Sequence, residues 1–349
     1  MGARVQTYVL LAGLILLATL PGYLGSAATA RFAVDMMVKL AFVIGLSIFV
    51  SNTGILSFGH AAFAGIAAYT SAWFTIPVIT KKVFLPDLPA FVLSTDLGLW
   101  GGMALGMLLA AIVAAIFGVA VVRLAGIGAS IATLAFLAIV NTTMSHATGL
   151  TKGTASLIGL PLSVNLPVAT AVVLASLLVA SVFAGSRAGL MLRASREDEV
   201  AALASGIAVR RLRLAAFVLS AALVGASGVL QGHAIGILSV SQFYLELTFL
   251  TLAMLVIGGQ HSLSGAVVGA IAIAFVGEVL RNLAGGFAIA GLTIPAMPGL
   301  REVGLAILML VVLILRPSGI TGNRELTFAN LLRRGTRRRE AQADTAISD

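Results

Sequence analysis

The sequence contains no cysteine among its 349 residues, which excludes disulfide bonds, thiolate nucleophiles and cysteine-ligated metal sites. Charged residues are also scarce, at 10% of the chain, whereas soluble globular domains carry roughly 25%. No part of the sequence is polar enough over a sufficient length to form a soluble catalytic domain. Apolar residues make up 59% of the chain instead, and the mean hydropathy is +1.08.

These apolar runs indicate a polytopic, helical membrane protein. A hydrocarbon core of about 30 Å requires roughly 20 apolar residues per helix. We predict an all-α fold of about ten transmembrane helices in one domain over residues 1–322, followed by a basic tail over residues 323–349. The predicted spans are 5–22, 34–51, 55–76, 99–122, 127–147, 166–185, 213–236, 246–258, 263–284 and 300–315. The eighth is too short to cross alone, so we expect it to be tilted, broken or re-entrant.

The distribution of basic residues predicts the orientation of the chain. Of the 22 Lys and Arg residues, seven lie at or after Arg316 and six lie between Arg187 and Arg213. Ten spans place both regions and the N-terminus on one side, as the positive-inside rule requires of cytoplasmic segments. The net charge of +9 does not indicate nucleic-acid binding, because no basic patch is interleaved with stacking aromatic residues. The basic tail is expected to be solvated or to bind lipid headgroups.

Ionisable residues are rare inside the predicted spans. Asp35 and Lys39 are four residues apart, and Glu278 and Arg281 are three residues apart. Both spacings place the two side chains on one helix face, so we interpret each as a structural ion pair near the outer end of its helix. The middle of the membrane has almost no carboxylates, which argues against a proton relay or a carboxylate sodium site.

A polar cluster is predicted where the second span gives way to the third, in the segment NTGILSFGHAAFAGIAAY (52–69). Asn52, Ser57 and His60 lie there among glycines that permit a sharp turn. Two interpretations stay open, a hydrogen-bonded turn between helices and the lining of a translocation path. No second histidine or carboxylate stands at ligand spacing, so no metal site is expected. The chain has no phosphate-binding or hydrolase motif, so we expect neither catalysis nor a cofactor of its own.

The central loop SREDEVAALASGIAVRRLR (195–213) is the most highly charged internal segment, with three acids and four arginines. Read as a helix, it has Ser195 as its expected N-cap and Gly206 as its end. We predict a short cytoplasmic helix within loop 186–213, between the sixth and seventh spans, whose small-residue face docks on another protein. The alternative is a solvated loop that only follows the positive-inside rule.

Five blocks, in order, resemble the permease subunits of branched-chain amino-acid ABC importers over roughly residues 35–322. The blocks are GILSFGHAAFAGIAAY (54–69), RLAGIGASIATLAFLAIV (123–140), the region 186–230 around the central loop, LVIGGQHSLSGAVVGAIAIAFVGEVLR (255–281) and LREVGLAILMLVVLILRPSGITG (300–322). The chain departs from the family pattern at Phe63-Ala64 and at Gln260-His261, and these departures bear on substrate more than on architecture.

The resemblance implies a permease of the bacterial inner membrane that imports branched-chain amino acids. It implies two cytoplasmic ATPases that bind the ATP, a second and paralogous permease, and a periplasmic substrate-binding protein. By the same resemblance, the ATPase-contacting helix includes Arg196, Glu197, Asp198, Glu199, Ala202 and Gly206. The alternatives are transport of urea, short amides or another small polar solute, a stand-alone ion-coupled carrier that depends on Glu278, and a membrane scaffold without transport.

Overall fold

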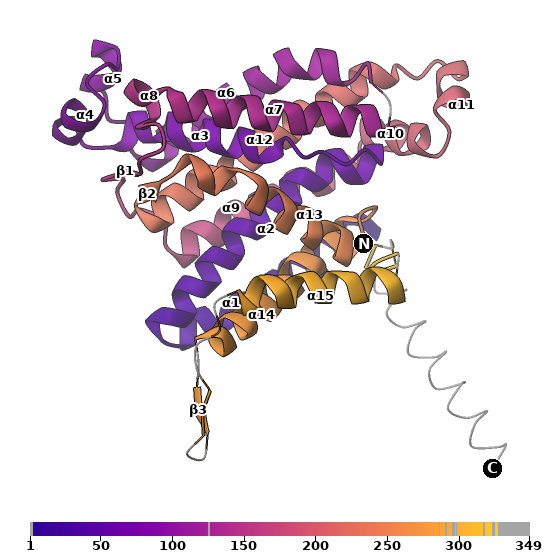
Figure 1. Ribbon diagram of the computed structural model, residues 1–349. Coiled ribbons are helices and arrows are strands. Elements are labelled where there is room, and N and C mark those ends of the chain that lie inside the picture. The colour runs from indigo at the N-terminus through magenta and orange to yellow at the C-terminus, as the bar shows by residue number, and fades with distance from the viewer. Residues whose placement is uncertain are drawn as a thin grey trace.

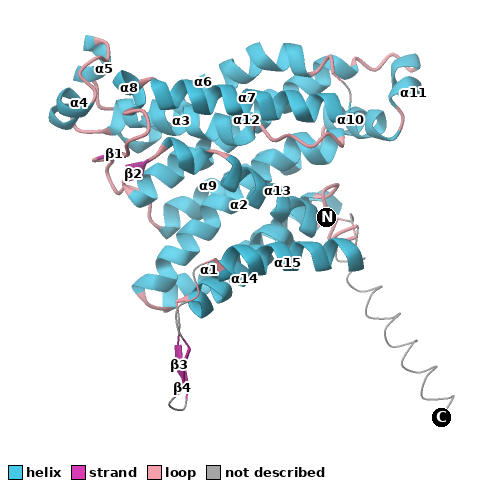
Figure 2. Ribbon diagram, in the orientation of Figure 1, coloured by secondary structure: helices cyan, strands magenta, loops and turns pink. Residues whose placement is uncertain are grey.

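The computed structural model describes residues 3–124, 126–285, 287–289, 292–294, 297, 299–316, 318–322 and 325–326. Helices dominate this part of the chain (Figures 1 and 2). They are α1 (Ala3–Leu24), α2 (Ala27–Thr53), α3 (His60–Thr75), α4 (Val78–Phe84), α5 (Ala90–Ser94), α6 (Gly98–Val121), α7 (Gly126–His146), α8 (Thr148–Thr151), α9 (Leu166–Gly185), α10 (Arg187–Glu197), α11 (Glu199–Ala204), α12 (Val209–Ile235), the 3-10 helix η1 (Val240–Phe243), α13 (Leu245–Gly258), α14 (Leu263–Ala284) and α15 (Leu300–Leu315). Two short antiparallel strand pairs join β1 (Leu157–Ile158) to β2 (Ile237–Leu238) and β3 (Phe287–Ile289) to β4 (Leu292–Ile294).

The all-α polytopic architecture predicted from the sequence is confirmed. Eight helices in the described residues are long and apolar enough to span a membrane, and they include α13 when it is counted together with η1. The other two predicted spans correspond to α3, which has 16 residues, and to α15, whose apolar stretch is Val303–Val312. The predicted tail over 323–349 lies outside the described residues except for 325–326.

The predicted third span begins too early. Helix α3 starts at His60 and not at residue 55, because α2 ends at Gly54, which has φ +73°, and residues 54–59 are not helical. Glycine adopts this left-handed conformation without the steric penalty that a side chain would bring. The result is a short stretch of irregular backbone between two largely buried helices, of the kind that membrane proteins tolerate only inside the protein or along a cavity.

Helix α2 is central to the packing. It contacts α12, α9, α14 and α1, and Figure 1 shows it running through the middle of the bundle. Helices α3, α6 and α12 form the rest of the core and approach one another closely at small residues. A Cβ added at Gly228 would lie 2.1 Å from the Ala64 carbonyl oxygen, and one added at Gly106 would lie 2.5 Å from that of Ala67. Only glycine permits these contacts.

The connections fall into two groups at opposite ends of the bundle (Figure 1). Helices α10 and α11 lie at one end, near the start of α1. At the other end lie α4, α5 and the β1–β2 pair, which form an outer layer over the core. This arrangement agrees with ten crossings of the membrane, and it places the start of α1 on the same side as the central loop.

A buried lysine organises the segment 77–98 at this second end. The ammonium of Lys81 donates to the carbonyl oxygens of Trp73 at 3.1 Å and of Val92 at 3.0 Å, and also to that of Thr95. These carbonyls belong to the last turn of α3, to α5 and to the residue that follows α5, so the Lys81 ammonium ties the ends of these two helices together. Burial lowers the pKa of Lys81, and the charge of Asp96 opposes this shift.

Candidate functional site

The central loop consists of two helices and not one. Ser195 lies inside α10, where its hydroxyl donates to the Leu192 carbonyl at 2.7 Å, so its predicted role as an N-cap is wrong. Asp198 is the N-cap instead, because the chain breaks there and the Asp198 carboxylate accepts a hydrogen bond from the Ala201 amide at 2.9 Å. Gly206 has φ +79° and follows the end of α11, in agreement with its predicted role.

Arginine side chains tie α10 to the ends of two membrane helices. Arg196 donates to the Ser51 carbonyl in the last turn of α2 at 2.7 Å, and it forms an ion pair with Glu197 at 2.7 Å. Arg193 donates to the Ala184 carbonyl at the end of α9 at 2.6 Å. Both carbonyls belong to helix C-terminal turns, where a cation is favourable.

A bidentate ion pair ties α11 to α12. The two terminal nitrogens of Arg213 lie 2.9 and 2.8 Å from the two carboxylate oxygens of Glu199. Arg213 is buried, with 6% of its side chain exposed, whereas Glu199 is 40% exposed. The fork-shaped guanidinium and the planar carboxylate match in this geometry, so the pair fixes orientation as well as distance. The central loop is therefore attached to α2, α9 and α12.

The exposed surface of α11 combines part of the predicted small-residue face, Ala201 and Ala204, with two larger apolar side chains. Ala202 is buried against the rest of the chain, and Glu199 is engaged with α12. Val200 is 79% exposed and Leu203 is 54% exposed, so α11 presents two branched apolar side chains outward. A Cβ at Gly206 would meet no atom of this chain within 4 Å. A side chain at Gly206 would therefore begin in open space.

The loop between α13 and α14 lies within electrostatic reach of the central loop. The hydrogen bond and charge of Arg196 hold the pKa of the Glu197 carboxyl below its ordinary value, and His261 contributes in the same direction. Burial lowers the pKa of His261, and Arg196 lowers it further while Glu197 opposes the shift. The departure from the family pattern at residue 261 thus lies beside the charged helix pair.

The irregular backbone of residues 54–59 is held by hydroxyl groups of α7. Ser130 donates to the Leu56 carbonyl at 2.7 Å, and the Phe58 amide donates to the Thr133 hydroxyl at 3.1 Å. Backbone groups outside a helix need such partners at membrane depth. Two separate sequence blocks, around residues 54–69 and 123–140, therefore form one structural unit.

His60 connects three elements through a hydrogen-bonded chain. Its Nδ1 lies 2.7 Å from the Ser57 hydroxyl and its Nε2 lies 2.8 Å from the Ser220 hydroxyl of α12. Ser220 also donates its only hydroxyl hydrogen to the Gly45 carbonyl of α2 at 2.7 Å. Ser220 must then accept from Nε2–H, and in a neutral imidazole Nδ1 accepts from Ser57. Every polar atom of the His60 ring is satisfied.

Aromatic rings surround this histidine. The centroids of Phe217, Phe63 and Phe49 lie 5.4, 5.8 and 5.9 Å from the His60 ring centroid. His60 is 1% exposed, so it packs as a polar joint inside an apolar core. This geometry agrees with the first interpretation, in which Ser57 and His60 hold the turn between α2 and α3 by hydrogen bonds. A role for these two residues in a translocation path stays a prediction.

Asn52 does not share this network in the structure. Its amide donates to the Ile48 carbonyl one turn earlier in α2 at 2.8 Å. Asn52 lines a cavity of about 10 Å³ together with Arg193, His261 and Glu325, among others, a space the size of one water molecule. The predicted polar cluster is therefore divided between the α2–α3 turn and the junction of the loops at the central-loop end.

The segment after α15 completes that junction. The Glu325 carboxylate accepts from the amides of Leu263 at 2.8 Å and Ser264 at 3.1 Å, at the first turn of α14. The Thr321 hydroxyl donates to the Gly258 carbonyl at 2.9 Å. A carboxylate at a helix N-terminus satisfies free amides and interacts favourably with the helix dipole. The blocks 255–281 and 300–322 are thereby joined near the central loop.

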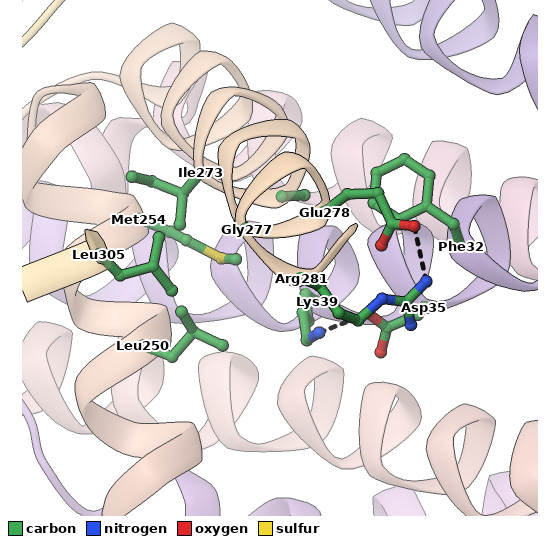
Figure 3. A pocket seen from close by; sticks show the side chains of 11 residues that line it. Phe32, Asp35, Lys39, Leu250, Met254, Ile273, Gly277, Glu278, Arg281 and Leu305 are labelled. Atoms are coloured by element: carbon green, nitrogen blue, oxygen red, sulfur yellow. Dashed lines mark hydrogen bonds and ion pairs between the residues drawn. The ribbon is translucent and has the colours of Figure 1, made fainter. Parts of the chain in front are cut away.

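A cavity of about 210 Å³ lies between α2, α13, α14 and α15. It brings together the two ion pairs that the sequence predicts separately, Lys39 with Asp35 and Arg281 with Glu278, the latter at 2.6 Å. Figure 3 shows these charged side chains on one side of the cavity and apolar side chains on the other. The apolar side chains are those of Leu250, Met254, Ile273 and Leu305.

Several of these residues carry no local signal in the sequence. Ser220 and Ser130 look like ordinary small residues of membrane helices, and Glu325 lies in a charged tail. Lys81 stands next to Lys82 in what reads as a solvated basic pair. Their roles depend on partners that are distant along the chain. Among the described residues, no group of three or more His, Cys, Asp or Glu side chains is placed to hold a metal ion.

Comparison with known proteins identifies the family. Two relatives, from Escherichia coli (strain K12) and Salmonella typhimurium (strain LT2), are each named high-affinity branched-chain amino acid transport system permease protein LivM. They are 27% and 25% identical to this chain over 315 residues, covering 80% of it and 70% of each relative. No solved structure matches the chain. The model of the family described as branched-chain amino acid transport system, permease component, matches residues 28–315, and the chain belongs to this family.

Proposed function

We propose that this chain is a membrane-spanning subunit of an ATP-driven importer of the bacterial inner membrane. Two separate cytoplasmic subunits bind and hydrolyse the ATP, and the transported solutes are branched-chain, hydrophobic amino acids. Membership of the permease family supports the proposal, as do the names of the two LivM relatives. The central loop and both termini face the cytoplasm in this proposal, and the basic residues of residues 187–213 support that orientation.

The observation that carries the proposal is the attachment of the central loop. Helix α11 presents Val200 and Leu203 outward, while Arg196 and the Glu199–Arg213 pair connect the loop to α2 and α12. A partner that binds the exposed face of α11 can therefore move membrane helices through short, charge-assisted contacts. A loop that served only to retain positive charge would need none of these contacts.

Other partners follow from the same proposal. A second, paralogous permease and membrane lipid would cover the apolar side chains that α6 and α7 expose, such as Ile116, Ile131 and Ile139. A periplasmic binding protein would deliver the solute at the end formed by α4, α5 and the β1–β2 pair.

Gly206 offers a sharp test of ATPase docking. Gly206→Trp and Gly206→Ala share the strain of a side chain at φ +79°, about 1–2 kcal/mol. In both variants the Cβ would have no other atom of this chain within 4 Å. The tryptophan alone adds bulk where a partner would bind. We expect Gly206→Trp to insert normally in the membrane but to lose co-purification of the ATPase subunits, whereas Gly206→Ala retains it. Wild-type co-purification with Gly206→Trp would overturn the docking proposal.

A transport assay tests the energy source and the solute. In proteoliposomes that contain the assembled transporter, uptake of labelled L-leucine should require ATP, and urea or acetamide should not compete. Uptake by this chain alone under an imposed proton or sodium gradient would instead support the ion-coupled carrier. Competition by urea would support a small polar solute as the cargo.

A further inference from the structure

The cavity between α2, α13, α14 and α15 combines opposite charges with an apolar wall. We propose that it is a binding site in this chain for the zwitterion of a hydrophobic α-amino acid. Lys39 would bind the carboxylate, Glu278 the ammonium, and the apolar wall the side chain. This inference rests on the proposed function, since it assigns a site to the solute that the transporter carries.

The exposure of the four charged groups distinguishes the two inner ones. Lys39 is 17% exposed and Glu278 is 21% exposed, whereas their partners Asp35 and Arg281 are 55% and 57% exposed. The two most buried charges therefore have opposite signs and come from different helices, α2 and α14. A free amino acid carries the same two charges on adjacent groups of one small molecule, so it can satisfy both at once.

The apolar wall is suited to a branched aliphatic side chain. Met254 and Ile273 are buried, and Leu250 and Leu305 are partly buried beside them. The cavity volume of about 210 Å³ is below the roughly 300–1,000 Å³ of sites for drug-sized ligands, as is appropriate for a solute of amino-acid size. The charged and apolar linings lie on different sides (Figure 3), which matches the two ends of such a molecule.

Structural ion pairing alone does not account for this arrangement. An ion pair within one exposed helix contributes about 0.3–0.5 kcal/mol, whereas a charged residue within a membrane span is expensive to place. Four such residues from two helices gather around one cavity, and the inner two, Lys39 and Glu278, are the least exposed of them. Binding a zwitterion supplies the reason for keeping the inner two.

The test measures binding to the full chain in nanodiscs of phosphatidylglycerol, a lipid without an amine that could occupy the Glu278 position. The ligands are L-leucine, L-leucinamide, which lacks the carboxylate, and 4-methylvalerate, which lacks the ammonium. The variants are Lys39→Met and Glu278→Gln. The matched control is Glu246→Gln, which changes an exposed acid in the first turn of α13.

We expect Glu278→Gln to weaken L-leucine and L-leucinamide binding by about tenfold or more and to leave 4-methylvalerate binding unchanged. Lys39→Met should weaken L-leucine and 4-methylvalerate but not L-leucinamide. This crossed pattern requires a folded protein, because each variant must still bind one ligand normally. Equal effects of a variant on all three ligands, or L-leucine binding at wild-type strength in both variants, would overturn the proposed site.

These outcomes are separable from those of the proposed function. The binding measurement needs neither ATP nor partner subunits, so a crossed pattern supports the site even if uptake proves to be driven by an ion gradient. Conversely, ATP-driven uptake with unaltered binding in both variants would refute the site and leave the importer proposal in place.

Discussion

Removing the Ser220 hydroxyl should destabilise the chain through His60. In Ser220→Ala, the His60 Nε2–H loses the acceptor that lies 2.8 Å away in a site closed to water by three phenylalanine rings. Leaving a buried donor without an acceptor costs about 1–3 kcal/mol. A value of about 2 kcal/mol corresponds to a roughly 30-fold change in the unfolding equilibrium constant.

Ser227→Ala is the matched control, because Ser227 is equally buried on the same helix. Its hydroxyl donates only to the Val224 carbonyl of its own helix, at 2.7 Å. Such back-bonding slightly destabilises helices and alanine is the better helix former, so we expect Ser227→Ala to be nearly neutral. Unfolding would be followed by tryptophan fluorescence during titration with sodium dodecyl sulfate in mixed micelles.

A double-mutant cycle with His60→Phe isolates the interaction. Phenylalanine fits the aromatic surroundings and has no N–H to satisfy, so Ser220→Ala should be much less destabilising in that background. The reasoning would be refuted if Ser220→Ala and Ser227→Ala had the same effect, or if the effect of Ser220→Ala were unchanged in His60→Phe.

Two further predictions concern buried contacts. Lys81→Met should destabilise the chain by about 2 kcal/mol, since it removes a charged donor from three carbonyl oxygens. Lys82→Met, at an exposed position, should change stability by less than about 0.5 kcal/mol. Thermal unfolding in detergent compares the two variants, and equal shifts in their unfolding temperatures would contradict the role assigned to Lys81. Gly228→Ala should destabilise the chain by about 1–3 kcal/mol, because the added Cβ would lie 2.1 Å from a backbone carbonyl oxygen. Gly13→Ala should be tolerated in the same assay, because a Cβ added at Gly13 has no other atom within 4 Å.

Local sequence patterns predicted the features that depend on neighbours within a helix. The all-α architecture with its eight long apolar helices among the described residues, the Asp35–Lys39 and Glu278–Arg281 pairs and the end of α11 just before Gly206 all follow from apolar runs, from spacing or from glycine. Each needs only residues within a few positions along the chain. These features therefore carry a signal that can be read without knowing the tertiary structure.

Contacts between distant segments were not predictable in this way. Ser195 and Asp198 are both good N-cap residues, and the choice between them depends on α10 continuing far enough for Arg196 to reach the Ser51 carbonyl. The sequence pattern likewise predicted one polar cluster for Asn52 and His60. In the structure the turn at Gly54 lies between them, and they have different hydrogen-bond partners. The cavity itself could not be inferred, because its two ion pairs lie more than 200 residues apart in the sequence and meet only through helix packing.

Helix α2 connects the central loop to the cavity lined by Lys39 and Glu278. Near its C-terminal end the Ser51 carbonyl binds Arg196 of the central loop, and 12 residues earlier, about 18 Å along the axis at 1.5 Å per residue, Lys39 lines the cavity. Gly45, between them, accepts from Ser220, so α2 and α12 are joined within the core. A force applied at α11 thus acts on a helix that carries one of the two inner charges, while Glu278 is carried by α14. Displacement of α2 relative to α14 would change the separation of Lys39 and Glu278, and with it the affinity for a zwitterion of fixed length.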